Sequence, residues 1–123
     1  MFGDTEAFSG FAVDDLEKAR DFYAETLGLK ASVLEEGQLM TLHIAGGRDV
    51  FVYAKPDHTP ATYTILNFPV DDIDAAVDGL AARGVVFERY EGFEQDENGV
   101  ARGQPDIAWF KDPAGNILSV LHR

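Results

Sequence analysis

The sequence contains no cysteine, which excludes disulfides, zinc–thiolate sites, iron–sulfur clusters and cysteine nucleophiles. It also has no apolar run near the roughly 18 residues that a membrane span requires. The N-terminal segment MFGDTEAFSG lacks the basic and apolar regions of a secretory signal. We therefore expect no membrane span and no leader, and we expect a cytoplasmic location.

Basic residues are few: Lys and Arg total 10 against 22 Asp and Glu, which gives a net charge of −12. Nucleic acids and anionic membranes are bound through Lys and Arg, so we expect neither as a partner. A negative field attracts cationic ligands, although acidity also simply keeps a protein soluble. Hydrophobic residues make up 46% of the 123 positions, which is enough for one compact domain.

The chain repeats one pattern, FAVDDLEKARDFYAETLGL at 11–29 and FPVDDIDAAVDGLAARGV at 68–85. Asp14 or Asp15 is a candidate helix N-cap, and Asp14 with Glu17 has the spacing of a capping box, as Asp71 with Asp74 has more weakly. Apolar residues then recur at helical spacing and predict one apolar face per helix. Gly28 and Gly84 follow where a left-handed C-cap belongs.

Alternating, β-rich segments surround both helices and predict the strands 7–13, 30–36, 39–45, 49–55, 63–70, 85–91, 106–112 and 116–123. Turns are predicted at Gly37-Gln38, at Gly46-Gly47 and in DPAGN, 112–116. The fold class is therefore α+β, with two tandem βαβββ modules that form an eight-stranded curved mixed sheet and helices on its convex face. We expect one domain over 1–123, with module 1 at about 1–54, a linker at 55–62 and module 2 at about 63–123.

VDDLEKARDFYAETLGL and WFKDPAGNILSV resemble the signature segments of the vicinal oxygen chelate superfamily, which includes glyoxalase I, bleomycin-resistance proteins and extradiol dioxygenases. The resemblance covers nearly the whole chain and implies the same paired modules. Enzymes of this superfamily typically hold one divalent metal through four strand positions, mostly His and Glu.

Carried over to this sequence, those four positions fall on Phe8, on Phe51 or Val52, on Ile65 and on Ser119. Apolar side chains bind no metal, and a neutral hydroxyl is a poor ligand for a transition metal. Within the resemblance, this departure from the usual ligand set implies a metal-free, bleomycin-resistance-like member without a cofactor. It disfavours a metal-dependent glyoxalase, epimerase, transferase or dioxygenase.

Strand alternation predicts which other side chains share the face of these positions. Tyr63 and Asn67 fall on the face of Ile65, where the Asn67 amide could orient a ligand. Trp109 could stack on a planar or cationic ligand, or pack in the core. Phe93 belongs to the polar segment 89–106, which we expect to be a mobile lid. The predicted ligand-binding residues are Phe8, Phe51, Tyr63, Ile65, Asn67, Phe93, Trp109 and Ser119.

His43, in the predicted strand 39–45, is the one candidate catalytic residue, because imidazole can act as a general base near neutral pH. Packing within the sheet or at a dimer interface is the competing interpretation. His58 lies in the linker and is expected to be exposed. The sequence has no phosphate-binding glycine motif, and its spacing alone predicts no Ser–His–Asp or paired-carboxylate site.

These observations together predict a homodimeric cytoplasmic protein that binds a small organic molecule, cationic or aromatic, in an apolar concavity without a metal. A role in drug resistance or sequestration follows from the resemblance. The alternative is a metal-independent lyase, isomerase or hydrolase of the same superfamily, and a structural protein with a filled cavity is a third interpretation.

Overall fold

The computed structural model describes residues 1–34 and 38–123. Two compact units make up the chain, residues 1–58 and residues 59–123. The predicted turn at Gly37-Gln38 and the end of the predicted strand 30–36 involve residues 35–37, so they lie at least partly outside the described residues. Within the described ranges, no helix has both the length and the apolar character to cross a membrane.

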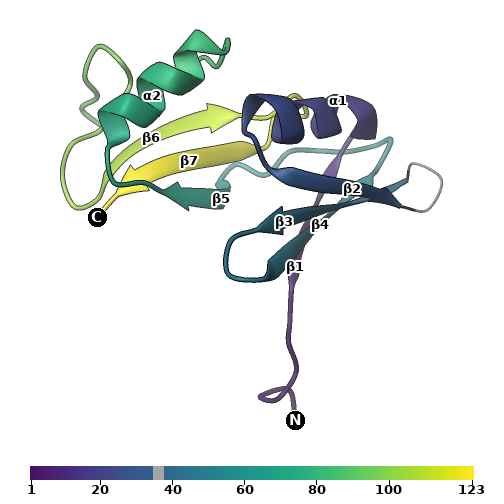
Figure 1. Cartoon of the computed structure of the whole chain (residues 1–123). Helices are drawn as coiled ribbons and strands as arrows, with labels where there is room; N and C mark the ends of the chain where they lie inside the picture. The colour runs from purple at the N-terminus through teal and green to yellow at the C-terminus, as the bar shows by residue number, and fades with distance from the viewer. Residues whose placement is uncertain (35–37) are drawn as a thin grey trace. The chain divides into compact units, whose positions relative to one another are not determined.

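The first unit is a four-stranded mixed sheet with a helix over one face (Figure 1). Its strands lie in the order β1-β4-β3-β2, and β1 runs parallel to β4 while the other pairs are antiparallel. The helix α1, Leu16–Asp21, continues as a short π-helix η1, Phe22–Thr26, and contacts β3 and β4. The strands are β1 Ser9–Val13, β2 Lys30–Leu34, β3 Leu39–Ile44 and β4 Arg48–Ala54.

The two faces of the first sheet differ in character. Met40, Leu42 and Val52 are fully buried and belong to the face that α1 covers. The alternate residues of β3 and β4 point to the other face, where Thr41 is paired with Phe51 and His43 with Asp49. Polar and aromatic candidates therefore share the face opposite the helix.

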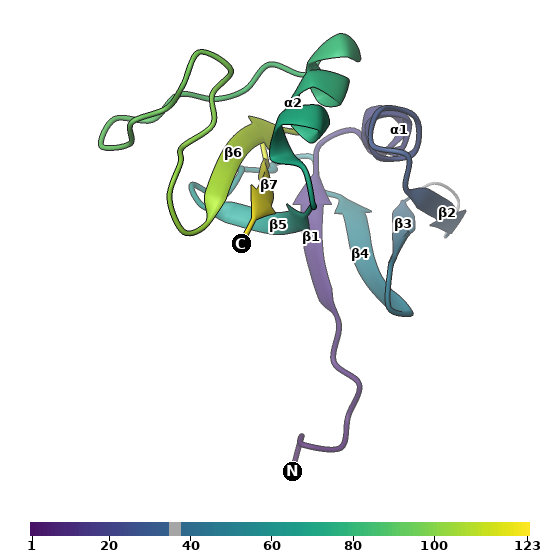
Figure 2. The same ribbon diagram turned by 60° about the vertical axis from the view of Figure 1, so that its left-hand side comes forward.

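The second unit is a three-stranded mixed sheet in the order β5-β7-β6, with β5 parallel to β7 (Figure 1). Its helix α2 packs on β6 and β7, whose covered face is fully buried at Ala108, Phe110 and Leu118. Figure 2 shows the long segment between α2 and β6 running out beyond the β6 edge. The elements are β5 Thr64–Pro69, α2 Ile73–Ala82, β6 Asp106–Lys111 and β7 Ile117–His122.

Both helices begin at the second aspartate of their VDD segment. The Asp15 carboxylate accepts a hydrogen bond from the Lys18 N–H, and Asp72 accepts one from the Ala75 N–H. These bonds satisfy backbone donors that have no partner inside the helix. The N-cap is thus Asp15 rather than Asp14, so the predicted capping boxes at Asp14 and Asp71 do not form.

The predicted α+β class is confirmed, but the predicted single sheet of eight strands is not, because residues 1–34 and 38–123 form seven strands in a four-stranded and a three-stranded sheet. The missing strand is 85–91, where Phe87 makes only an isolated bridge to Phe110. The Gln95 side chain accepts from the Tyr90 N–H and donates to the Glu88 carbonyl. A single amide side chain therefore occupies the backbone groups that a longer ladder would use.

Candidate functional site

The first unit brings together Phe8 and Phe51, whose ring centroids lie 4.5 Å apart. Phe8 immediately precedes β1 and is 62% exposed, while Phe51 lies in β4 opposite Gly10. Val52 is fully buried on the opposite face. Phe51, and not Val52, therefore shares the face of Phe8.

The second unit brings together Asn67, Ser119 and Trp109, which form one row across the sheet. Ser119 of β7 is paired with Asn67 of β5 on one side and with Trp109 of β6 on the other. The Ser119 hydroxyl, which is fully buried, donates to Asn67 Oδ1 at 2.5 Å. This bond holds the amide oxygen toward Ser119 and leaves the exposed Asn67 NH₂ directed elsewhere.

Two further aromatic rings pack on Trp109. The Tyr90 ring meets it edge-on with centroids 5.4 Å apart, and the Phe93 ring lies 4.9 Å away at a tilted angle. Trp109 is only 9% exposed, whereas Phe93 remains 55% exposed. We call the surface formed by Asn67, Tyr90, Phe93, Trp109 and Ser119 the aromatic face. The sequence did not single out Tyr90, since only the folded loop brings it to Trp109.

Tyr90 contributes a polar group to the aromatic face. Its hydroxyl is shielded from solvent and has no hydrogen-bond partner among the described residues. Burial, and then the nearby Glu88 carboxylate, raise the pKa of Tyr90 above its ordinary value. The phenol is therefore a protonated donor without an acceptor, an arrangement that usually costs about 1–3 kcal/mol.

The remaining predicted residues of the second unit are not in this row. Tyr63 precedes β5 and is largely exposed. The register of β5 with β7 shifts between Thr64 and Leu66, and Thr64 takes the place opposite Ile117. Ile65 is the extra residue at this bulge, so simple alternation from Ile65 to Asn67 does not hold. The prediction that Tyr63, Ile65 and Asn67 share one face assumed a strand without a bulge.

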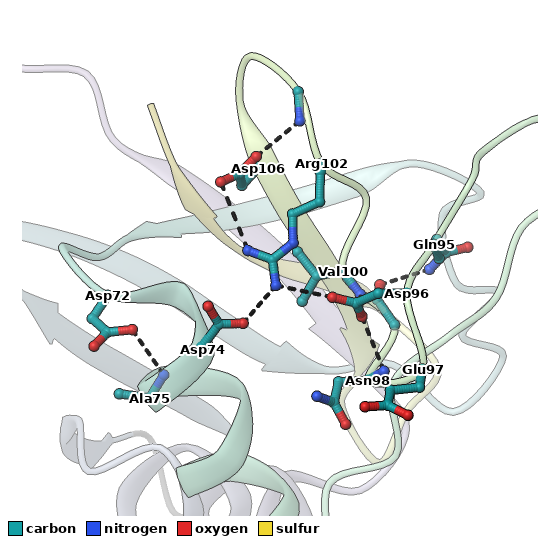
Figure 3. Close-up of polar contacts among 12 residues, drawn as sticks. Asp72, Asp74, Ala75, Gln95, Asp96, Glu97, Asn98, Val100, Arg102 and Asp106 are labelled. Carbon is teal, nitrogen blue, oxygen red and sulfur yellow. Dashed lines mark hydrogen bonds and ion pairs between the residues drawn. The ribbon is translucent and has the colours of Figure 1, made fainter.

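The segment 89–106, which we expect to be a mobile lid, makes several hydrogen bonds within itself and to α2. Arg102 donates to Asp74 Oδ1 of α2 at 2.6 Å and to Asp96 Oδ2 at 2.9 Å (Figure 3). Asp106 lies 3.9 Å from the guanidinium. We call this group, Asp74, Asp96, Arg102 and Asp106, the Arg102 clamp. It ties the Phe93 segment to the helix.

The other Asp96 oxygen organises the turn itself, because it accepts from the Asn98 and Val100 N–H groups. Burial favours the protonated form, but the bonds from Val100, Arg102 and Asn98 outweigh it and lower the pKa of Asp96. The carboxylates of Asp74 and Asp96 in turn raise the pKa of Arg102. Both charges are therefore maintained at neutral pH.

The four positions that the resemblance implies for a metal do not fit one. The Phe8 and Phe51 rings pack against each other at a tilted angle, Ile65 lies at the bulge, and the Ser119 hydroxyl donates to Asn67. No group of three or more His, Asp or Glu side chains in the described part of the chain could hold an ion. A transition metal needs several nitrogen or charged oxygen donors, and the residues at these positions offer none.

His43 lies on the same face as Phe51 and makes two hydrogen bonds. Its Nε2 lies 2.9 Å from Ser32 Oγ, and its Nδ1 lies 2.9 Å from Asp49 Oδ1. No sequence pattern connects Ser32 and Asp49 with His43, because their pairing depends on the register of β2, β3 and β4. His58, expected to be exposed, is half-buried.

The fold and the two residue groups define an α+β protein built from βαβββ-type units whose helix-free faces carry aromatic and polar side chains. The model of the Glyoxalase/Bleomycin resistance protein/Dioxygenase superfamily matches residues 7–120. The chain therefore belongs to this superfamily. No functionally curated protein matches the chain by sequence.

Solved structures of the superfamily share the fold. A superfamily member from Sphaerobacter thermophilus is 25% identical, with a TM-score of 0.68 and coverage of 97% of this chain and 98% of that one. TnmS3, an antibiotic binding protein from a Streptomyces species, is 24% identical over 97% of each chain, with a TM-score of 0.67. The fosfomycin resistance protein FosX from Listeria monocytogenes is 15% identical, covers 98% and 93%, and has a TM-score of 0.72.

Proposed function

We propose that this protein binds a small planar organic molecule at the aromatic face of its second unit, without a metal of its own. The observation that carries the proposal is the position of Trp109, which has the exposed Phe93 on one side and the Ser119–Asn67 pair in the same row. A planar ligand would stack on these rings, and each aromatic contact contributes about 0.5–1.5 kcal/mol beyond area burial.

Two polar groups would orient such a ligand. The Asn67 NH₂ makes no hydrogen bond within the described residues, because the bond from Ser119 uses the amide oxygen, and this supports its role as a donor to a ligand carbonyl. The unpaired Tyr90 hydroxyl would gain the most from an acceptor, since its donor is already desolvated. We therefore favour a planar ligand that carries carbonyl or hydroxyl oxygens.

The charge of the ligand, the biological role and the assembly of the protein are also part of the proposal. The net charge of −12 favours a ligand with a cationic substituent. Antibiotic binding by TnmS3, which has the same fold, supports a role in drug sequestration or resistance. We further propose a cytoplasmic homodimer, in which the exposed Phe8 side chain is covered by a second copy.

A thermal-shift screen tests the binding proposal. The probes are cationic antibiotics, planar aromatic acids and ketoaldehydes, each with and without a chelator, with Phe93→Ala as the site variant and exposed Phe2→Ala as its matched control. We expect planar probes to raise the melting temperature of the parent and of Phe2→Ala, chelator or not, and to raise it less in Phe93→Ala. No shift with any probe would overturn the proposal, as would a shift abolished by the chelator.

The alternative function, a metal-independent hydrolase, is favoured by one specific observation, the hydrogen-bonded Ser32, His43 and Asp49 of the first unit. Neither a lyase nor an isomerase finds comparable support in the contacts of the described residues.

A further inference from the structure

Ser32, His43 and Asp49 form a continuous hydrogen-bonded relay on the helix-free face of the first sheet. The two bonds, Ser32 Oγ to His43 Nε2 and His43 Nδ1 to Asp49 Oδ1, are both 2.9 Å long. They use the two different nitrogens of the imidazole. This connectivity and these lengths are those of an activated serine: nucleophile to base, and base to an orienting carboxylate.

The direction of each proton follows from the groups themselves. An ionised carboxylate can only accept, so Nδ1 carries the hydrogen that is donated to Asp49. The neutral ring then has its lone pair on Nε2, and the Ser32 hydroxyl donates to it. The geometry thus directs the Ser32 hydroxyl proton at a base that can remove it. An exposed serine without such a partner has no base to activate it.

The surroundings provide access and an apolar contact. β2 is the edge strand of its sheet among the described residues, and Ser32 is exposed. Phe51 lies two residues from Asp49 on β4, and its ring contacts the Phe8 ring. Lys30 is paired with His43 across the sheet and is two residues from Ser32, so its side chain leaves the same face. In the reaction that we infer, its ammonium group would stabilise the developing oxyanion.

We infer that the first unit has a serine esterase activity toward small esters with an aromatic or apolar group, independent of the ligand proposed for the second unit. Ser32 Oγ attacks the ester carbonyl carbon while His43 Nε2 takes the hydroxyl proton. The bond from carbon to the alcohol oxygen then breaks, and the leaving alcohol takes that proton from His43. Water next attacks the acyl-serine and gives a proton to His43, which returns it to Ser32 as the acid departs.

Labelling by a fluorophosphonate, with mass spectrometry to locate it, tests the nucleophile, and turnover of 4-nitrophenyl phenylacetate tests the reaction. We expect stoichiometric labelling at Ser32, none in Ser32→Ala, and at least a roughly 100-fold slower labelling rate in His43→Ala, the usual loss for a general base. Ser9→Ala, on β1 of the same sheet, is the matched control and should label like the parent. Circular dichroism verifies that each variant is folded.

Asp49 acts through His43 as a positioning residue, and its readout is the ¹⁵N spectrum of the imidazole. The parent should show the Nδ1–H form, and Asp49→Ala should shift the ring toward Nε2–H and slow the labelling. No label on Ser32 in the folded parent, or equal labelling rates in the parent and His43→Ala, would overturn the inference. Phe93→Ala should leave labelling unchanged, so this result is separate from the outcome for the second unit.

Discussion

At the scale of single residues, Gly99 has the most demanding backbone position in the loop that carries Phe93. Its φ is +94°, and a Cβ added there would lie 2.9 Å from the Phe87 Cβ. Both the left-handed conformation and the contact therefore require glycine. The turn holds Asp96 and Val100 in hydrogen-bonding positions, so the glycine supports the Arg102 clamp indirectly.

We predict that Gly99→Ala lowers the free energy of unfolding by about 1–3 kcal/mol, the usual cost of a strained backbone position. Gly103→Ala is the matched control in the same segment, because its φ is not positive and no atom lies within 4 Å of its added Cβ. Urea denaturation of both variants measures the difference. An equal effect of the two substitutions would contradict this account of the turn.

Several single residues were predictable from the sequence because their roles are local. Asp15 is one of the two caps that the sequence offers for the first helix, whereas the second helix is capped by Asp72 and not by the predicted Asp71. Gly28 and Gly84 have the positive φ expected after a helix. The Ser119–Asn67 bond joins positions 52 residues apart. No local pattern specifies such a contact, and the same holds for Ser32 and Asp49 beside His43.

At the scale of elements, the Arg102 clamp joins the 89–106 segment to the first turn of α2. The Arg102 and Asp74 side chains are about half exposed and their attraction is screened by water, so the clamp should restrain the segment without dominating the stability of the fold. We predict that Asp74→Asn increases amide hydrogen exchange in 92–104. Asp78→Asn, one turn further along α2, has no contact with Arg102 among the described interactions and should leave exchange unchanged. Equal exchange in all three proteins would count against the clamp.

The clamp should also weaken in acid. The folded state lowers the pKa of Asp96, so its stabilising contribution is fully present above the ordinary pKa of about 4. It is lost as the pH falls through the lower folded value, when the unfolded chain already binds the proton. We expect Asp96→Asn to destabilise the protein at pH 7 and to have little effect near pH 2. A destabilisation that is the same at both pH values would refute this assignment.

The elements show where sequence patterns succeed. Alternation over 106–112 and 116–123 predicts two strands correctly, because both are buried on the face that α2 covers. The same kind of pattern over 85–91 does not form a strand, since the Gln95 side chain bonds the Glu88 and Tyr90 backbone. The Gln95 side chain uses backbone groups that strand pairing would otherwise use, and a hydrophobic pattern does not reveal such a side-chain bond.

At the scale of the whole molecule, the net charge of −12 makes ligand steering depend on ionic strength. We predict that a planar cationic probe binds more weakly as salt rises, while a neutral planar probe is nearly unaffected because stacking is not screened. Titrations of an acridinium and an anthraquinone at 20 mM and 500 mM salt, between which the Debye length shortens roughly fivefold, make the comparison. Equal salt dependence for the two probes would show that charge has no part in selection.

The central claim is that a planar organic molecule binds without a metal at the aromatic face, on the exposed Phe93 ring that lies 4.9 Å from the buried Trp109. Trp109 is the one tryptophan in the sequence. Its intrinsic fluorescence therefore reports directly on the aromatic face during titration with an acridinium, an anthraquinone and a planar aromatic acid. The account predicts saturable quenching by at least one of them, unchanged by a chelator and roughly 2–10-fold weaker in Phe93→Ala. Absence of saturable quenching with all three, or its loss on chelation, would contradict the account.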